Sequence, residues 1–232
     1  MPPKPPLPPF PAPPLYDDWI RFLFDRPVTR KKWYDEYEFE GFHAEPLELV
    51  RLLTATCRRY GTDLEPFSDG QVALGLNYLF IPTVSDVIDP LKNEAVPVAD
   101  RIEAIESLLT LYTDCFARRC EDRMSHVDDG RRPLNDLNLR CYMLWDESGL
   151  DYWERVPGKE RFYAAVAGVL EQVLRIDHTA CIESALHGLG HIQMYAHNEV
   201  KFALKGWPNH HKRRFPDALY AYAREASLGQ VQ

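Results

Sequence analysis

The side chains best suited to chemistry lie between Cys181 and His197, in the stretch CIESALHGLGHIQMYAH. On a helix, Glu183, His187 and His191 follow one another at four-residue intervals along one edge. Two imidazoles one turn apart can bind a single zinc ion through their ring nitrogens. Glu183 cannot easily share that ion with His191, because eight residues rise by ~12 Å along a helix. The spacing therefore predicts His187 and His191 as metal ligands.

A third ligand must come from another part of the chain. The residues considered for it are His178, His197, His210 and Asp177, and the sequence alone does not place any of them. The zincin signature has a glutamate directly after its first histidine, whereas this chain has Gly188 there. The histidine pair is therefore not that of a zincin.

The same stretch also has a purely structural interpretation, which we favour. A glycine inside a helix costs about 1 kcal/mol relative to alanine, and that cost is explained if Gly188 lets a neighbouring helix approach closely. Histidines beside such a face are often satisfied by a carbonyl, a carboxylate or water. The small side chains that would form this face are Cys181, Ser184, Ala185 and Gly188.

A cysteine and a histidine at the start of this stretch form a second candidate group. Cys181 lies three residues after His178, so the two side chains could meet at a helix end as a nucleophile and its base. A reactive thiol needs exposure to substrate. Because the small-residue face predicts that Cys181 is buried, we do not expect it to act as a nucleophile.

Composition restricts the classes of partner. The chain has 232 residues, of which 45% are hydrophobic, and its 27 basic and 35 acidic residues give a formal net charge of −8. An acidic protein repels nucleic-acid phosphates and would suit a basic protein partner. The one locally basic stretch, KGWPNHHKRRF at 205–215, is interpreted as a solvated face or as salt-bridge partners. We therefore predict no nucleic-acid binding.

Cysteine usage and hydrophobicity indicate the compartment. Five cysteines are present and no secretory signal is recognised, so we expect reduced thiols and a cytoplasmic location. The longest apolar run, VALGLNYLFIP, is far shorter than a membrane span. No membrane association is predicted. The cysteines are Cys57, Cys115, Cys120, Cys141 and Cys181.

Hydrophobic periodicity predicts an all-α fold. Residues 1–15 form a Pro-rich arm, which we expect to be disordered or extended because proline cannot join helix or sheet hydrogen bonding. Residues 16–232 carry helical patterns, the strongest from Val98 to Arg123, and Ser68 is a predicted N-cap. Short links between helices favour a single domain of stacked helical hairpins, an irregular α-solenoid.

Four stretches resemble segments of a family of uncharacterised bacterial α-helical proteins. They are PFSDGQVALGLNYLF, YTDCFARRC, CYMLWD and DHTACIESALHGLGHIQ. The resemblance covers about Trp33 to Trp207, and the C-terminal helical pair of that family is similar to a HEAT-type repeat. It implies a fold and no activity, cofactor or catalytic residue. HEAT-like pairs usually bind proteins, which favours a binding role by analogy alone.

Two functions follow as expectations. The first is a non-enzymatic cytosolic protein-binding scaffold without a cofactor, for example a bacterial immunity or antitoxin protein that neutralises a partner. Small size, acidity and the lack of a catalytic motif favour it. The alternative is a metal-dependent helical enzyme, with zinc held by His187 and His191.

Overall fold

The computed structural model describes residues 10–36, 38–126, 134–205, 207 and 214–231. Helices and irregular segments make up these ranges, and none of their residues lies in a strand, so the prediction of an all-α fold is confirmed. Three short helical turns separate or extend the α-helices: η1 (Trp33–Asp35), η2 (Asp89–Lys92) and the π-turn η3 (Tyr112–Phe116). The α-helices are α1 (Tyr16–Phe24), α2 (Pro46–Arg58), α3 (Tyr60–Asp63), α4 (Asp69–Phe80), α5 (Val98–Leu111), α6 (Ala117–Arg119), α7 (Asp136–Glu147), α8 (Lys159–Val173), α9 (Thr179–Ile192), α10 (His197–Ala203) and α12 (Asp217–Leu228).

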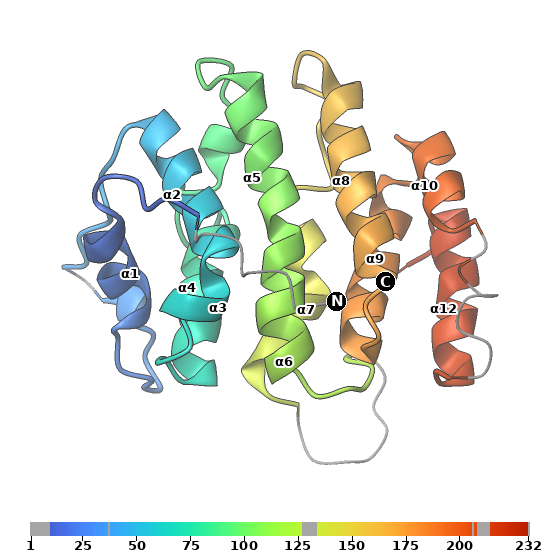
Figure 1. The fold of residues 1–232 in the computed structure, drawn as a ribbon, viewed down its shortest axis with the longest axis horizontal. Coiled ribbons are helices and arrows are strands. Elements are labelled where there is room, and N and C mark those ends of the chain that lie inside the picture. Colours follow the sequence, from blue (N-terminus) through green and yellow to red (C-terminus); the bar gives the residue numbers. More distant parts are fainter. Residues whose placement is uncertain (1–9, 37, 127–133, 206, 208–213, 232) are drawn as a thin grey trace, which may run out of the picture.

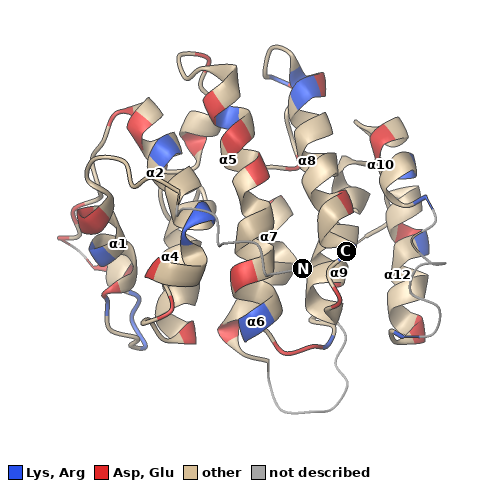
Figure 2. Ribbon diagram, in the orientation of Figure 1, with Lys and Arg blue, Asp and Glu red and all other residues tan. Residues whose placement is uncertain are grey.

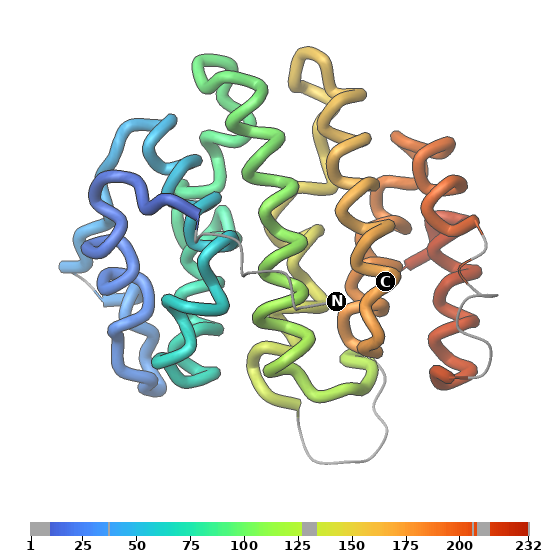
Figure 3. The backbone as a smooth tube through the Cα atoms, viewed as in Figure 1, coloured from blue at the N-terminus to red at the C-terminus, as the bar shows by residue number. Residues whose placement is uncertain are grey.

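The longer helices form two rows. Helices α1, α4, α7, α9 and α12 pack one against the next in the first row, and α2, α5, α8 and α10 do so in the second. Figure 1 shows these helices following one another along the long axis of the molecule in chain order. The backbone tube makes the same progression visible from blue to red (Figure 3). Apolar side chains buried between the helices form one continuous cluster.

Local sequence signals fix where several helices begin. Ser68 caps α4, because its hydroxyl accepts a hydrogen bond from the Gln71 amide while the Gln71 side chain accepts from the Ser68 amide. This reciprocal pair satisfies two amides that the first helical turn leaves free, and the prediction of Ser68 as N-cap is confirmed. Asn135 caps α7 through the Asn138 amide.

The N-terminal arm is described only in part. Residues 1–9 lie outside the described structure, so the disorder expected there stays a prediction. Phe10 packs against the core, and its carbonyl oxygen accepts a hydrogen bond from the Arg59 guanidinium. The end of the predicted arm therefore contacts the helical domain, and α1 begins at Tyr16.

Helices α7 and α9 approach each other closely at the small-residue face predicted for α9. A Cβ atom added to Gly188 would lie 2.9 Å from the Trp145 ring of α7 and 3.0 Å from Leu170 of α8. The Ser184 hydroxyl of α9 donates to the Cys141 carbonyl of α7, one turn away from this contact. The expectation that Gly188 admits a neighbouring helix is therefore confirmed.

Opposite charges are interspersed along the helices. Figure 2 shows basic and acidic residues on the same helix for α5, α8 and α12. Arg214, in the basic stretch, forms an ion pair with Asp177, as expected of a salt-bridge partner; residues 208–213 of that stretch are outside the described structure. Among the described helices, none combines the length and apolar character that crossing a bilayer requires.

Replacing Gly188 with alanine should destabilise the fold. The added methyl group must displace Trp145 or Leu170, and overpacking of this kind costs about 1–3 kcal/mol. Gly168→Ala in α8 is the matched control, since nothing lies within 4 Å of its added Cβ; it should be neutral or stabilising by up to ~1 kcal/mol. Urea unfolding of the three proteins measures both effects. Equal stability of the two variants would contradict the close contact.

Candidate metal centre

Three metal-binding side chains converge between α7 and α9. Asp146 of α7 and His187 and His191 of α9 each offer one ligand atom, and these atoms all lie within 4.8 Å of one another. Nε2 of His187 is 3.7 Å from Oδ2 of Asp146, and the two imidazole centroids are 4.6 Å apart. Two imidazoles and one carboxylate form a donor set used by zinc and by non-haem iron.

The ring nitrogens that face away from this cluster are engaged by other residues. Nδ1 of His187 is 2.7 Å from the Tyr222 hydroxyl, which comes from α12. Nδ1 of His191 is 3.4 Å from Oδ2 of Asp151, just beyond α7. Each imidazole therefore keeps Nε2 for the cluster. Partners on the second ring nitrogen are usual for metal-binding histidines, because they fix the tautomer and the ring orientation.

Two buried polar atoms of this cluster make no hydrogen bond. Nε2 of His187 and Oδ1 of Asp146 have no hydrogen-bond partner. An unsatisfied buried polar atom costs about 1–3 kcal/mol. A cation bound between the imidazole nitrogen and the carboxylate would satisfy both groups at once.

Neighbouring side chains shift the pKa values of Asp146 and His191 in opposite directions. Burial alone would raise the pKa of Asp146, but the His187 imidazole, 3.7 Å away, lowers it below its usual value. The Asp151 carboxylate, which accepts from the ring N–H of His191, raises the pKa of that histidine and outweighs burial. Asp146 is therefore ready to bind a cation near neutral pH, while a proton competes with a metal for His191.

One side of the cluster is open to solvent. The His187 side chain is 2% exposed, whereas those of His191 and Asp146 are 30% and 23% exposed. The helix thus presents one histidine to the core and the other to the surface. Three protein ligands with an accessible side leave a coordination position for water or substrate, as in catalytic zinc sites.

Glu183 does not belong to this cluster. Its side chain is fully buried, and its carboxylate accepts hydrogen bonds from the backbone amides of Ser125, at 2.6 Å, and His126, at 3.2 Å. The His126 ring also contacts it, with 2.5 Å between Nδ1 and Oε1. Glu183 therefore anchors the chain after α6, and its separation from His191 agrees with the rise of the helix.

The residues considered for the third ligand lie elsewhere. His178 is buried with Nε2 3.2 Å from the Cys120 carbonyl, and His197 contacts Gln193. Asp177 pairs with Arg214, and His210 lies outside the described residues. The carboxylate that the structure brings to the histidines is Asp146, at the end of the CYMLWD stretch.

Asp146 was missed because no sequence feature links α7 to α9 directly. The usable signal was a spacing of four residues: Tyr142 and Asp146 stand one turn apart on α7, as His187 and His191 do on α9. Parallel edges of two packed helices can place such pairs opposite each other. The sequence does not show that α7 packs on α9, so the two spacings cannot be matched to each other from the sequence alone.

Cys181 and His178 form a buried pair. Hydrogen bonding with Cys141, and then with His178, lowers the pKa of the Cys181 thiol to about 7 despite burial. The Cys181 side chain is fully buried, and all five cysteines are free thiols. Substrate cannot reach this sulfur without a rearrangement of α9, and the predicted burial of Cys181 is confirmed.

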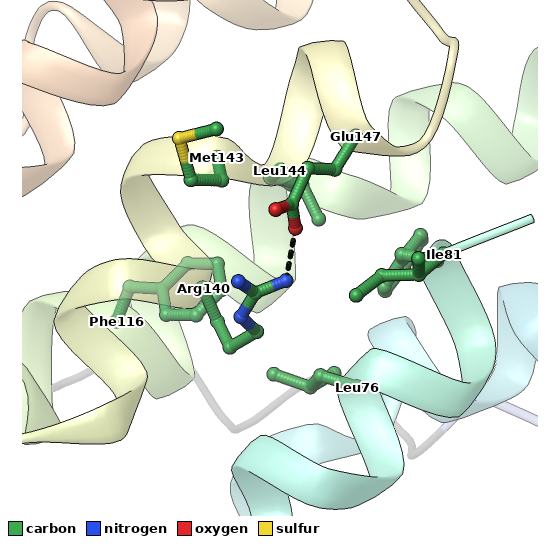
Figure 4. A pocket seen from close by; sticks show the side chains of 8 residues that line it. Leu76, Ile81, Phe116, Arg140, Met143, Leu144 and Glu147 are labelled. Carbon is green, nitrogen blue, oxygen red and sulfur yellow. Dashed lines mark hydrogen bonds and ion pairs between the residues drawn. The ribbon is translucent and has the colours of Figure 1, made fainter. Parts of the chain in front are cut away.

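A pocket between α4 and α7 is too small for a ligand. Figure 4 shows Leu76 and Ile81 facing α7, with an ion pair between Arg140 and Glu147 beside them. The pocket offers about 10 Å³ to a water-sized sphere, roughly the space of one water molecule. Of the features described here, the cluster around His187 has the stronger case as a functional site.

Comparisons with known proteins give no family assignment. No family model matches the chain, and no curated protein or solved structure resembles it significantly. The resemblance to a bacterial helical family and to HEAT-type pairs therefore stays a prediction.

The start of α9, which carries both histidines, should lose stability in acid. Asp122 accepts a hydrogen bond of 2.6 Å from the Thr179 amide at this helix start. Burial would raise the pKa of Asp122, but this backbone hydrogen bond leads the effects that lower it below 3.8. A carboxylate with a depressed pKa stabilises the fold above its unfolded-state pKa, and this stabilisation is lost as the pH falls through the folded-state value.

Asp122→Asn tests this effect, because it keeps the acceptor oxygen and removes the charge. The variant should be less stable than the wild-type protein at pH 7, and the difference should shrink as the pH falls below about 3.8. Urea unfolding across this pH range measures it. If the difference in unfolding free energy between the two proteins stayed constant with pH, protonation of Asp122 would not be the cause of the acid instability.

Proposed function

We propose that this protein binds a divalent transition-metal ion through Asp146, His187 and His191, and uses it as a catalytic centre. The observation that carries the proposal is a pair of buried atoms without a hydrogen bond, Nε2 of His187 and Oδ1 of Asp146. Both belong to groups that bind metals, and the third donor lies within the same 4.8 Å limit. The 3.7 Å between Nε2 of His187 and Oδ2 of Asp146 is too long for a hydrogen bond, but two bonds of ~2 Å to one ion can span it.

Zinc is the metal that we expect, and hydrolysis the class of reaction. Three protein ligands and an accessible side resemble a catalytic zinc site rather than a closed structural one. Zinc bound there would lower the pKa of a coordinated water to about 7 and so generate hydroxide near neutral pH. Asp151, beside His191, would help to orient that ligand.

Protein purified without a histidine tag should contain one equivalent of metal. His187→Ala, His191→Ala and Asp146→Asn each remove a donor, so each should lose this metal on dialysis. Metal at 100 times its dissociation constant would stabilise the wild-type protein by ~2.7 kcal/mol, and a chelator should remove that gain. Elemental analysis and thermal unfolding are the measurements.

His197→Ala is the matched control for these variants. It removes another imidazole, outside the cluster, that contacts Gln193, and its metal content should equal that of the wild-type protein. The metal centre would be refuted if the wild-type protein took up no zinc, iron or cobalt and its melting temperature did not change on addition of a chelator.

We propose protein binding by a HEAT-like scaffold as the second candidate. Support comes from the two rows of packed helices and from exposed apolar side chains between the end of α9 and the end of α12. In this function the protein is a cytosolic immunity or antitoxin protein that neutralises a basic partner, and no cofactor is needed. The exposed side chains are Met194, Tyr195, Phe202 and Leu228.

Phe202→Ser and Leu228→Ser should release the partner if these side chains bind it. Both residues are more than 60% exposed, at 66% and 64%, so their replacement leaves the core intact. Leu139→Ser on α7, 51% exposed, is the control and should retain binding. The measurement is capture of one defined protein from the producing cells. Equal capture by all three variants would place the binding surface elsewhere.

A further inference from the structure

Tyr222 connects α12 to the histidine that lies deepest in the cluster. Its side chain is buried, at 3% exposure. Its hydroxyl lies 2.7 Å from Nδ1 of His187 and 3.2 Å from the hydroxyl of Tyr142. No hydrogen bond reaches the other nitrogen of His187, which faces Asp146.

The two hydroxyl contacts can hold His187 in the tautomer that a metal requires. A hydroxyl has one proton to donate and two lone pairs to accept with. If Tyr222 donates to Tyr142, its oxygen accepts from Nδ1–H of His187. The neutral imidazole then carries its lone pair on Nε2, the nitrogen that faces Asp146. In the opposite tautomer, Nε2 would carry a hydrogen and could not bind a metal.

Aromatic packing holds the His187 ring in the same orientation. Tyr142 packs against it with 4.4 Å between centroids. Tyr222 lies nearly parallel to it, at an interplanar angle of 11°. His126 stacks on Tyr222 from another side, at 4.4 Å. With rings on several sides, the imidazole cannot turn to exchange its two nitrogens without moving α7 or α12.

We propose that Tyr222 is a positioning residue of the metal centre. Through its hydroxyl it holds His187 as the tautomer that presents the Nε2 lone pair to the ion, so that α12 controls metal affinity without supplying a ligand. The proposal rests on the proposed function, since it assigns a role at the same centre.

Tyr222→Phe tests the role of the hydroxyl, because it removes one oxygen and keeps the ring. Metal affinity, measured by competition with a chelating dye and with Co²⁺ as a spectroscopic probe, should fall about 10–100-fold, the usual loss for a partner of a ligand. The visible absorption bands of bound Co²⁺ should change as well, since the ligand geometry loosens. A merely structural role would lower the melting temperature and leave these bands as they are.

Tyr60→Phe is the matched control. It also removes the hydroxyl of a buried tyrosine, but one on α3 that accepts a hydrogen bond from Arg119 and lies outside the cluster. Its Co²⁺ spectrum and metal affinity should stay close to those of the wild-type protein. Equal losses in the two variants, or wild-type affinity in Tyr222→Phe, would overturn the proposal.

Nitrogen NMR of the His187 ring in metal-free protein provides a readout that needs no metal. The wild-type imidazole should be protonated at Nδ1, and Tyr222→Phe should shift it toward protonation at Nε2. A wild-type ring protonated at Nε2 would overturn the role of Tyr222 even if metal binds. Failure of the wild-type protein to bind metal would instead refute the metal centre, while the tautomer still decides what Tyr222 does.

Discussion

The close contact between α7 and α9 determines the rest of the site. Gly188 has no side chain, and the Trp145 ring therefore lies directly against the α9 backbone. Trp145 immediately precedes Asp146, and Gly188 immediately follows His187. The same contact that brings the two helices together thus places a carboxylate beside an imidazole. A larger residue at 188 would separate both pairs at once.

Hydrogen bonds around this contact leave little freedom for adjustment. Nε1 of Trp145 donates to the Tyr112 hydroxyl at 2.8 Å, and that hydroxyl lies 2.6 Å from the hydroxyl of Ser184 on α9. Tyr112 starts the π-turn that ends α5, a feature often found at functional sites. The hydrogen-bonded network on one side of Trp145 contrasts with the cluster on the other, where Nε2 of His187 and Oδ1 of Asp146 make no hydrogen bond.

The sequence predicted the local features and missed the tertiary ones. Helical periodicity, the Ser68 cap and the small-residue face around Gly188 depend on residues that are near in sequence, and each was predicted correctly. Asp146 and Tyr222 could not be found in this way. Tyr222 is 35 residues from the histidine that it contacts, and only the packing of α7, α9 and α12 within one row makes them neighbours. The amino-acid composition does not indicate which helices share a row.

The two rows also have a consequence for the order of folding. In the chain, neighbours in one row are separated by a helix of the other row, so each row forms through contacts between segments that are apart in sequence, which fold more slowly than purely local contacts. The histidine pair and Asp146 can meet as soon as α7 and α9 dock. Tyr222 reaches His187 only when α12 docks on α9. Until then, the imidazole lacks the hydroxyl contact on Nδ1 that sets its orientation.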